Sequence, residues 1–153
     1  MSKLDAQAIK QLREETGAGV LEIKKALEEF SGDMEKTRAH LMEKGKERAA
    51  SKSDRATGDG LIYSYIHPSG KVGSLIYLSC ETDFVAKTPE FQNLCKEIAM
   101  QTATTEYAGV DELLNDEYNR DDSKKIKDLI AETIAKVGEN IELKKICRFK
   151  VGE

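Results

Sequence analysis

The fold is decided by one stretch near the middle of the chain, residues 61–78, which read LIYSYI-HPSG-KVGSLIYL. Two runs rich in β-branched and aromatic residues flank a turn-forming segment at residues 67–70, and this order is typical of a β-hairpin. Residues 141–151 alternate apolar and charged side chains, as expected of a half-buried strand. The predicted apolar face of that strand holds Ile141, Leu143, Cys147, Phe149 and Val151. The sequence therefore predicts a small antiparallel sheet of three strands.

Helical patterns surround these strands. One helix is predicted to start at Pro89 and another to cover residues 123–137, whereas residues 106–122 are predicted to be mostly loop. Upstream, residues 1–45 contain three short helical patterns separated by the breaking runs TGAG and SGD. Helices this short are not stable alone, so they must pack as a bundle. The predicted fold class is α+β, with a three-helix unit followed by a three-stranded sheet packed against helices.

The junction between the two units is predicted near residue 55. Residues 46–55 are polar and permit a helix but lack a continuous apolar stripe, so they could be a helical extension or a solvated linker. Acidic residues interleave the basic ones, which favours a linker over an RNA-binding segment. We therefore assign residues 1–55 to the helical domain with its linker, and residues 56–153 to the sheet-containing subdomain.

Charge and composition exclude several classes of protein. The 153 residues carry a net charge of −4 and no clustered basic run, so nucleic acid is not an expected partner. No apolar run of about 18 residues is present, and the N-terminus lacks the apolar core of a signal peptide. The three cysteines are odd in number and far apart, which favours a reducing compartment. A cytoplasmic protein is expected.

Catalytic and ligand-binding motifs are missing from the sequence. Gly70-Lys71 lacks the remaining residues of a phosphate-binding loop, so direct nucleotide binding is not expected. His40 and His67 do not stand at metal-ligand spacing, and neither a metal nor a cofactor is expected. A thiol enzyme using Cys80 is an alternative, but the acidic residue after it disfavours a thiolate. We interpret all three cysteines as core residues: Cys80, Cys95 and Cys147.

One segment is not explained by packing alone. Phe84 follows a strand and stands among acidic and small residues, in the run Glu81–Val85. It could fold back onto the helix at Phe91, or it could be presented to the pocket of a partner protein. Pattern alone leaves both alternatives open.

Two motifs carry a resemblance to a known family. Residues 79–87, SCETDFVAK, resemble the NCETDFVA signature of elongation factor Ts, with serine in place of the usual asparagine. Residues 12–20, LREETGAGV, resemble the family's other signature, and the run KKAL at residues 24–27 matches what usually follows. The run GENI at residues 138–141 also looks familial. The resemblance spans nearly the whole chain.

The resemblance implies a fold, a partner and a site. The first unit would be like a ubiquitin-associated domain, and the whole would be a guanine-nucleotide exchange factor for elongation factor Tu, not an enzyme. A loop would enter the GTPase near its Mg²⁺ and phosphate site, with Phe84 as a wedge and Asp83 making polar contacts, while Thr82 and Val85 hold its shape. The N-terminal unit would dock elsewhere on the GTPase through residues that match the family motif, Leu12, Gly17, Ala18, Gly19 and Val20.

The chain has room for one core subdomain, whereas longer members of the family carry two. A single three-stranded sheet leaves an edge exposed, so a homodimer is expected. Cys147 could lie at that interface, although core packing is the preferred interpretation. A rival function is a binding module of the ubiquitin-associated type that acts through residues 1–45 without exchange activity.

Overall fold

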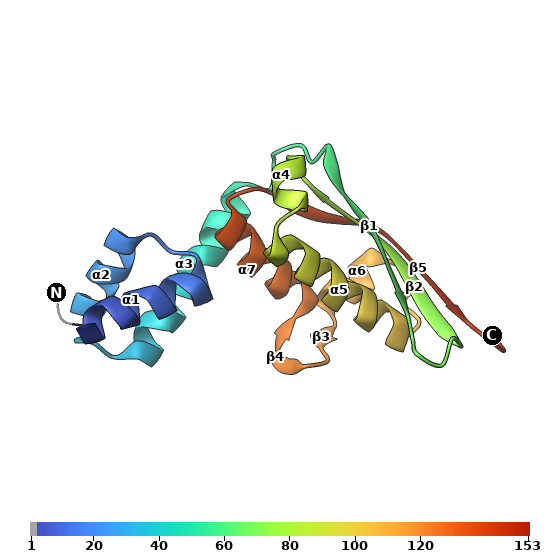
Figure 1. Cartoon of the computed structure of the whole chain (residues 1–153), viewed down its shortest axis with the longest axis horizontal. Coiled ribbons are helices and arrows are strands. Elements are labelled where there is room, and N and C mark those ends of the chain that lie inside the picture. The colour runs from blue at the N-terminus through green and yellow to red at the C-terminus, as the bar shows by residue number, and fades with distance from the viewer. Residues whose placement is uncertain (1–2) are drawn as a thin grey trace.

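The computed structural model describes residues 3–153, and its helical N-terminal part and its sheet lie at opposite ends of an elongated molecule (Figure 1). The N-terminal part contains three helices, α1 (Lys3–Thr16), α2 (Val20–Glu29) and α3 (Met34–Ser51). Their apolar sides meet in a separate hydrophobic cluster in which Leu12, Ile23 and Leu41 are fully buried. The predicted three-helix unit is confirmed, and the arrangement is consistent with a ubiquitin-associated-like domain.

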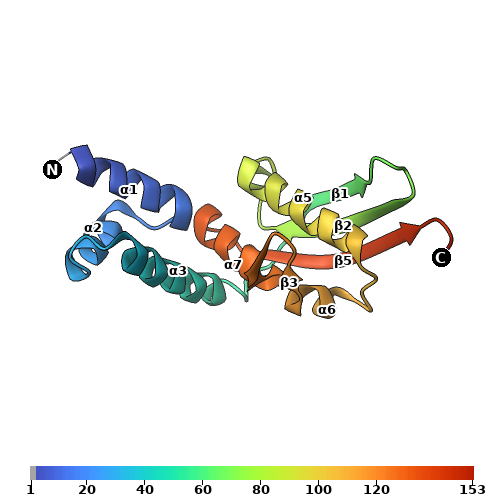
Figure 2. The same ribbon diagram turned by 90° about the horizontal axis from the view of Figure 1, so that it is seen from below.

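The predicted linker is wrong for its first half, because α3 continues through residues 46–51. Ala49 is buried in the hydrophobic cluster of the sheet-containing part, and α3 packs along α7 (Ile126–Val137). Figure 2 shows α7 lying between the N-terminal helices and the rest of the molecule. A helix about 80 residues away in the sequence thus supplies the surface that buries this turn, and a local pattern cannot show it.

The three-stranded sheet has the order β1-β2-β5 and is antiparallel throughout. Its strands are β1 (Asp59–Ile66), β2 (Val72–Cys80) and β5 (Ile141–Lys150). The amide of His67 donates to the carbonyl of Val72 over 2.9 Å and closes the predicted hairpin. The predicted α+β class and the sheet are therefore confirmed.

The predicted single apolar face of β5 is wrong, because a bulge interrupts the strand. Tyr77 pairs with Lys145 whereas Leu78 pairs with Leu143, so Lys144 is an extra residue. Side chains alternate along a strand, and one extra residue therefore moves all later side chains to the other face. Of the residues on the predicted apolar face, Ile141 and Leu143 before the bulge are buried, whereas Cys147, Phe149 and Val151 after it are exposed on the outer face. Ile146, which was predicted on the charged face, packs against the core instead.

Helices cover only the inner face of the sheet (Figures 1 and 2). Helix α5 (Pro89–Thr104) packs against β1 and β2, and α7 packs against α5. Phe91 of α5 is fully buried in the main hydrophobic cluster. The rest of this part comprises α4 (Asp83–Ala86), α6 (Val110–Asn115), β3 (Glu117–Tyr118) and β4 (Asp121–Lys125). The β3-β4 ribbon covers the end of the segment predicted to be mostly loop and extends into the helix predicted over residues 123–137, which begins at Ile126 instead.

Candidate functional site

The segment Glu81–Val85 leaves the sheet at the end of β2 and turns at once into the single-turn helix α4. The backbone of Thr82 is extended, and its hydroxyl accepts a hydrogen bond from the amide of Val85 over 3.4 Å. This is the usual capping arrangement of a threonine at a helix N-terminus. The turn was predicted as a loop, although a threonine three residues before Val85 is the sequence signal for such a cap.

The capped turn separates buried from exposed side chains. Val85 and Ala86 are buried in the main cluster, whereas the Phe84 side chain is 80% exposed. Asp83 is also exposed and forms an ion pair with Lys87 over 3.1 Å. The alternative in which Phe84 folds back onto the helix at Phe91 is wrong, because the Phe84 side chain lies in solvent. The backbone thus keeps a large aromatic ring in solvent.

Two residues that follow α7 support this turn through hydrogen bonds. The Glu139 carboxylate accepts from the Thr82 amide over 3.0 Å and from the Thr82 hydroxyl over 2.7 Å. The Glu81 carboxylate accepts from the Asn140 amide over 2.8 Å and lies 3.5 Å from the Arg55 guanidinium. Sequence reasoning missed these supporting residues. Their only signal was the family-like run at residues 138–141.

The N-terminal residues singled out in the sequence have different surroundings. Leu12 and Ala18 are buried in the helical cluster, so their side chains do not face a partner. Gly17 has φ +72, and a Cβ there would lie 2.7 Å from the Cα of Lys136 on α7. Gly19 is exposed and Val20 half-buried. The motif therefore contributes mainly to the bundle and its junction with α7, and only part of it is accessible.

An exposed residue beside this motif was missed. The side chain of Leu21 is 75% exposed at the start of α2. The apolar stripe of the predicted helix excludes it, because Leu21 lies one residue after Val20 and off the stripe formed with Ile23. A large apolar side chain off the stripe was the signal available in the sequence.

The cysteines do not form a reactive site. Burial, with a smaller contribution from the Glu139 carboxylate, raises the pKa of the Cys80 thiol to about 11. Burial also raises the pKa of Cys95 to about 12. Thiols with such values stay protonated near neutral pH, which argues against the thiol-enzyme alternative. Cys147 is exposed, so its interpretation as a core residue is wrong.

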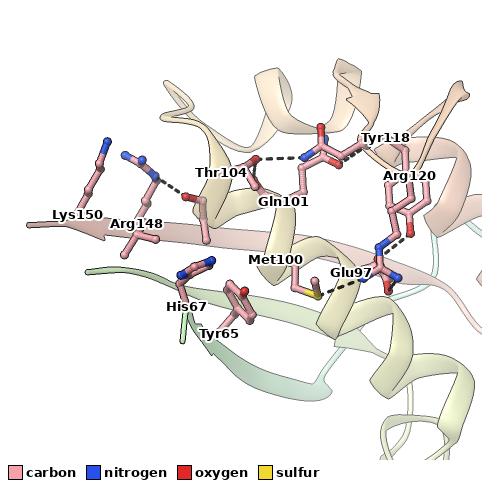
Figure 3. Close-up of a pocket in the computed structure, with 13 residues that line it drawn as sticks. Tyr65, His67, Glu97, Met100, Gln101, Thr104, Tyr118, Arg120, Arg148 and Lys150 are labelled. Carbon is pink, nitrogen blue, oxygen red and sulfur yellow. Dashed lines mark hydrogen bonds and ion pairs between the residues drawn. The ribbon is translucent and has the colours of Figure 1, made fainter. Parts of the chain in front are cut away.

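A pocket of about 540 Å³ lies beside α5, far along the helix from α4 (Figure 3). Several of the polar groups that line it bind other groups of the same pocket. Arg120 lies 3.3 Å from the Glu97 carboxylate, and the Tyr118 hydroxyl donates to the same carboxylate over 2.7 Å. The Arg148 side chain donates to the carbonyl of Ala103 over 2.9 Å. These contacts join the β3-β4 ribbon and β5 to α5 around the pocket.

Among the residues that the structure describes, no group of three or more His, Cys, Asp or Glu side chains is placed to hold a metal ion. Nor does this part of the chain contain a helix that is both long and apolar enough to cross a membrane. The feature of the described surface that stands out chemically is the aromatic ring of Phe84 at the tip of a supported turn.

Comparison with known proteins identifies a family. A model of the family described as elongation factor TS matches residues 81–153, a span that begins at the turn itself. Proteins named elongation factor Ts are similar over nearly the whole chain. Those of Coprothermobacter proteolyticus and Oleidesulfovibrio alaskensis are 41% and 39% identical over 196 and 197 residues, covering 99% of this chain and 100% of each relative.

These two alignments are longer than the 153 residues of the chain, so both relatives carry residues in the aligned span that this chain lacks. A relative from Clostridium botulinum, also named elongation factor Ts, is 43% identical over 148 residues. That alignment covers 97% of this chain but 48% of the relative, which is therefore about twice as long. Relatives of quite different length are thus similar to nearly the whole of this chain.

Proposed function

The chain belongs to the elongation factor Ts family and is a translation elongation factor, and from that premise we propose that it is a guanine-nucleotide exchange factor for elongation factor Tu. It promotes release of GDP from that GTPase and catalyses no chemical reaction of its own. An exchange factor needs only to bind the nucleotide-free GTPase more tightly than the GDP-bound form, because that difference alone shifts the population. Such a role requires a shaped surface, not a catalytic site.

The observation that carries this proposal is the exposure of Phe84. We name residues Thr82–Val85 the release loop, and we propose that it enters the GTPase near the Mg²⁺ and phosphate site. Phe84 is 80% exposed, while Val85 anchors the turn in the core. A large aromatic on a fixed backbone binds with a small loss of conformational entropy, as binding anchors generally do. Asp83 adds a negative charge beside the ring, suited to disturbing a Mg²⁺-phosphate site.

The helical domain, residues 1–55, is proposed to supply a second contact with the GTPase, while residues 56–153 carry the release loop. Of the motif residues singled out in the helical domain, Gly19 is exposed and Val20 is half-buried, and the exposed Leu21 lies next to them. We propose that these three residues form the contact surface. Leu12 and Ala18 support that surface from the buried side, and Gly17 fixes the bundle against α7.

The exchange activity is tested by following release of fluorescent GDP from elongation factor Tu in the presence of excess unlabelled nucleotide. The release rate is expected to rise with the concentration of this protein until it saturates, because the ternary complex forms before GDP leaves. Release in buffer alone is the control. A release rate that does not depend on the protein would rule out the proposed exchange activity.

The outer face of the sheet supports a homodimer. Of the seven exposed large hydrophobic side chains among the described residues, five lie on this face: Ile62, Ile66, Leu75, Phe149 and Val151. Four of the five line a shallow hollow of about 310 Å³. A contiguous apolar patch of this kind marks an interaction surface, and a two-fold axis lets two copies cover the same patch. We propose that a second copy of the chain covers this face.

Phe149→Glu is expected to separate the homodimer, because each interface would bury two unpaired carboxylates. Analytical ultracentrifugation at micromolar concentration should give about twice the chain mass of 17.0 kDa for the wild type and a single chain mass for the variant. Leu21→Glu, at an equally exposed position outside this face, should stay dimeric. A strictly monomeric wild type would contradict the proposal.

A further inference from the structure

Glu139 lies outside the release loop but contacts it through both carboxylate oxygens. Resting on the proposed function, we infer that Glu139 is a positioning residue for nucleotide release, which holds Thr82 and thereby the orientation of Phe84. One oxygen accepts from the Thr82 amide over 3.0 Å and the other from the Thr82 hydroxyl over 2.7 Å. Hydrogen bonds to an ionised carboxylate are about twice as strong as neutral ones.

The bond to the Thr82 hydroxyl sets the cap of α4. A hydroxyl has one proton to donate and lone pairs with which to accept. Because Thr82 donates its proton to Glu139, its lone pairs are free for the amide of Val85, which donates to it over 3.4 Å. Glu139 therefore fixes the rotamer in which Thr82 caps the turn, and the turn carries Phe84.

A second, reciprocal bond reinforces the same contact. Glu139 accepts from the backbone of the release loop, and Glu81 accepts from the backbone of Asn140 over 2.8 Å. The Asn140 side chain in turn donates to the carbonyl of Arg55 over 2.9 Å, in the segment that follows α3. Hydrogen bonds thus join the residues after β2 to the residues after α7, and join the residues after α7 to the segment after α3. We call this contact the Glu139 clamp.

The release loop needs such a clamp because α4 is only four residues long. A single helical turn is not stable by itself, since nucleation fixes several dihedral angles for one hydrogen bond. Without Glu139 the turn would sample other conformations, and ordering it on the GTPase would lower the affinity. The clamp acts before the partner arrives, so its loss should change the mobility of the free protein as well as exchange.

Glu139→Ala is expected to slow catalysed GDP release by about tenfold at subsaturating protein, the effect of losing hydrogen bonds to a charged group. Glu139→Gln keeps one acceptor and the side-chain shape, so it should recover part of the rate. Glu97→Ala is the matched control, because that carboxylate also contacts two polar groups, the side chains of Tyr118 and Arg120, but in the pocket of Figure 3. With this variant, elongation factor Tu should release GDP at nearly the rate seen with the wild-type protein.

The mobility of the release loop can be measured separately, and a general loss of stability in the folded protein does not change it. The chain contains no tryptophan, so Phe84→Trp places a single indole at the tip of the release loop. In that background, Glu139→Ala should lower the indole fluorescence anisotropy of the free protein, and Glu97→Ala should not. Far-UV circular dichroism should stay unchanged in both, which shows that the variants are folded.

The outcomes separate this role from the proposed function. Unchanged anisotropy and unchanged release in Glu139→Ala, alongside a defect in Phe84→Ala, would overturn the role of Glu139 and leave the exchange activity standing. A wild type that does not accelerate release would overturn both, while the anisotropy would still report whether Glu139 orders the turn. Equal defects in Glu139→Ala and Glu97→Ala would reduce Glu139 to a general stabilising residue and overturn its positioning role.

Discussion

Phe84→Ala is expected to weaken binding to nucleotide-free elongation factor Tu by roughly thirtyfold, or about 2 kcal/mol, which is the lower range for a buried aromatic anchor. The ring lies in solvent in the free protein, with 80% of its side chain exposed. Its removal should therefore leave the midpoint of thermal unfolding almost unchanged. Isothermal titration against the nucleotide-free GTPase measures the affinity, and circular dichroism measures the stability.

Phe84→Leu is the graded control, because it retains apolar volume but loses the planar ring. It should lie between wild type and Phe84→Ala in affinity. Wild-type affinity in Phe84→Ala would instead favour the rival in which the helical domain binds the partner alone. In that case the exposed ring would need another explanation, since the exposure of an aromatic side chain to water is unfavourable in free energy.

Phe91→Ala should have the opposite profile, with a large loss of stability. Phe91 lies only seven residues after Phe84 but is fully buried in the main cluster. Truncating a buried phenylalanine to alanine costs about 3–5 kcal/mol, from lost apolar transfer and the cavity that remains. Urea denaturation at a fixed protein concentration should report this loss as a lower midpoint.

Phe91→Leu keeps most of the volume and should cost under about 1.5 kcal/mol. The protein concentration must be held constant, because dimerisation contributes to the apparent stability. If Phe91→Ala changes the free energy of unfolding by less than about 1 kcal/mol, the core relaxes into the cavity, and Phe91 is not a main stabilising residue of the core. The two phenylalanines together thus separate a binding role from a packing role.

The periodicity of apolar residues predicted those helices and strands whose conformation depends mainly on neighbouring residues in the sequence. The hairpin at residues 61–78 and the helix that begins at Pro89 were recognisable because strand and helix periodicities differ, and both are confirmed. The bulge at Lys144 was not predicted, because it is defined by the pairing with β2, although Lys145 and Ile146 break the apolar alternation at that point. The continuation of α3 was likewise hidden, since α7 buries it from far along the chain.

The site was predictable only in part, for the same reason. The run that contains Phe84 attracted attention from composition alone, but its exposure required the structure. The supports Glu139 and Asn140 lie 57 and 59 residues from their partners, and no local pattern connects them. In the helical motif, Leu12 and Ala18 match the family signature yet are buried. A motif match thus does not distinguish residues that contact a partner from residues that hold the surface in shape.

We propose that Phe84 acts on the GTPase as a displacing side chain, and the rate of GDP release reports this action. Release of fluorescent GDP from elongation factor Tu should be compared with wild-type protein, with Phe84→Ala at the same subsaturating concentration, and without either. Wild type is expected to accelerate release, and Phe84→Ala is expected to lose roughly thirtyfold of that acceleration, in line with the lost anchor. Equal acceleration by the two proteins would contradict this proposal.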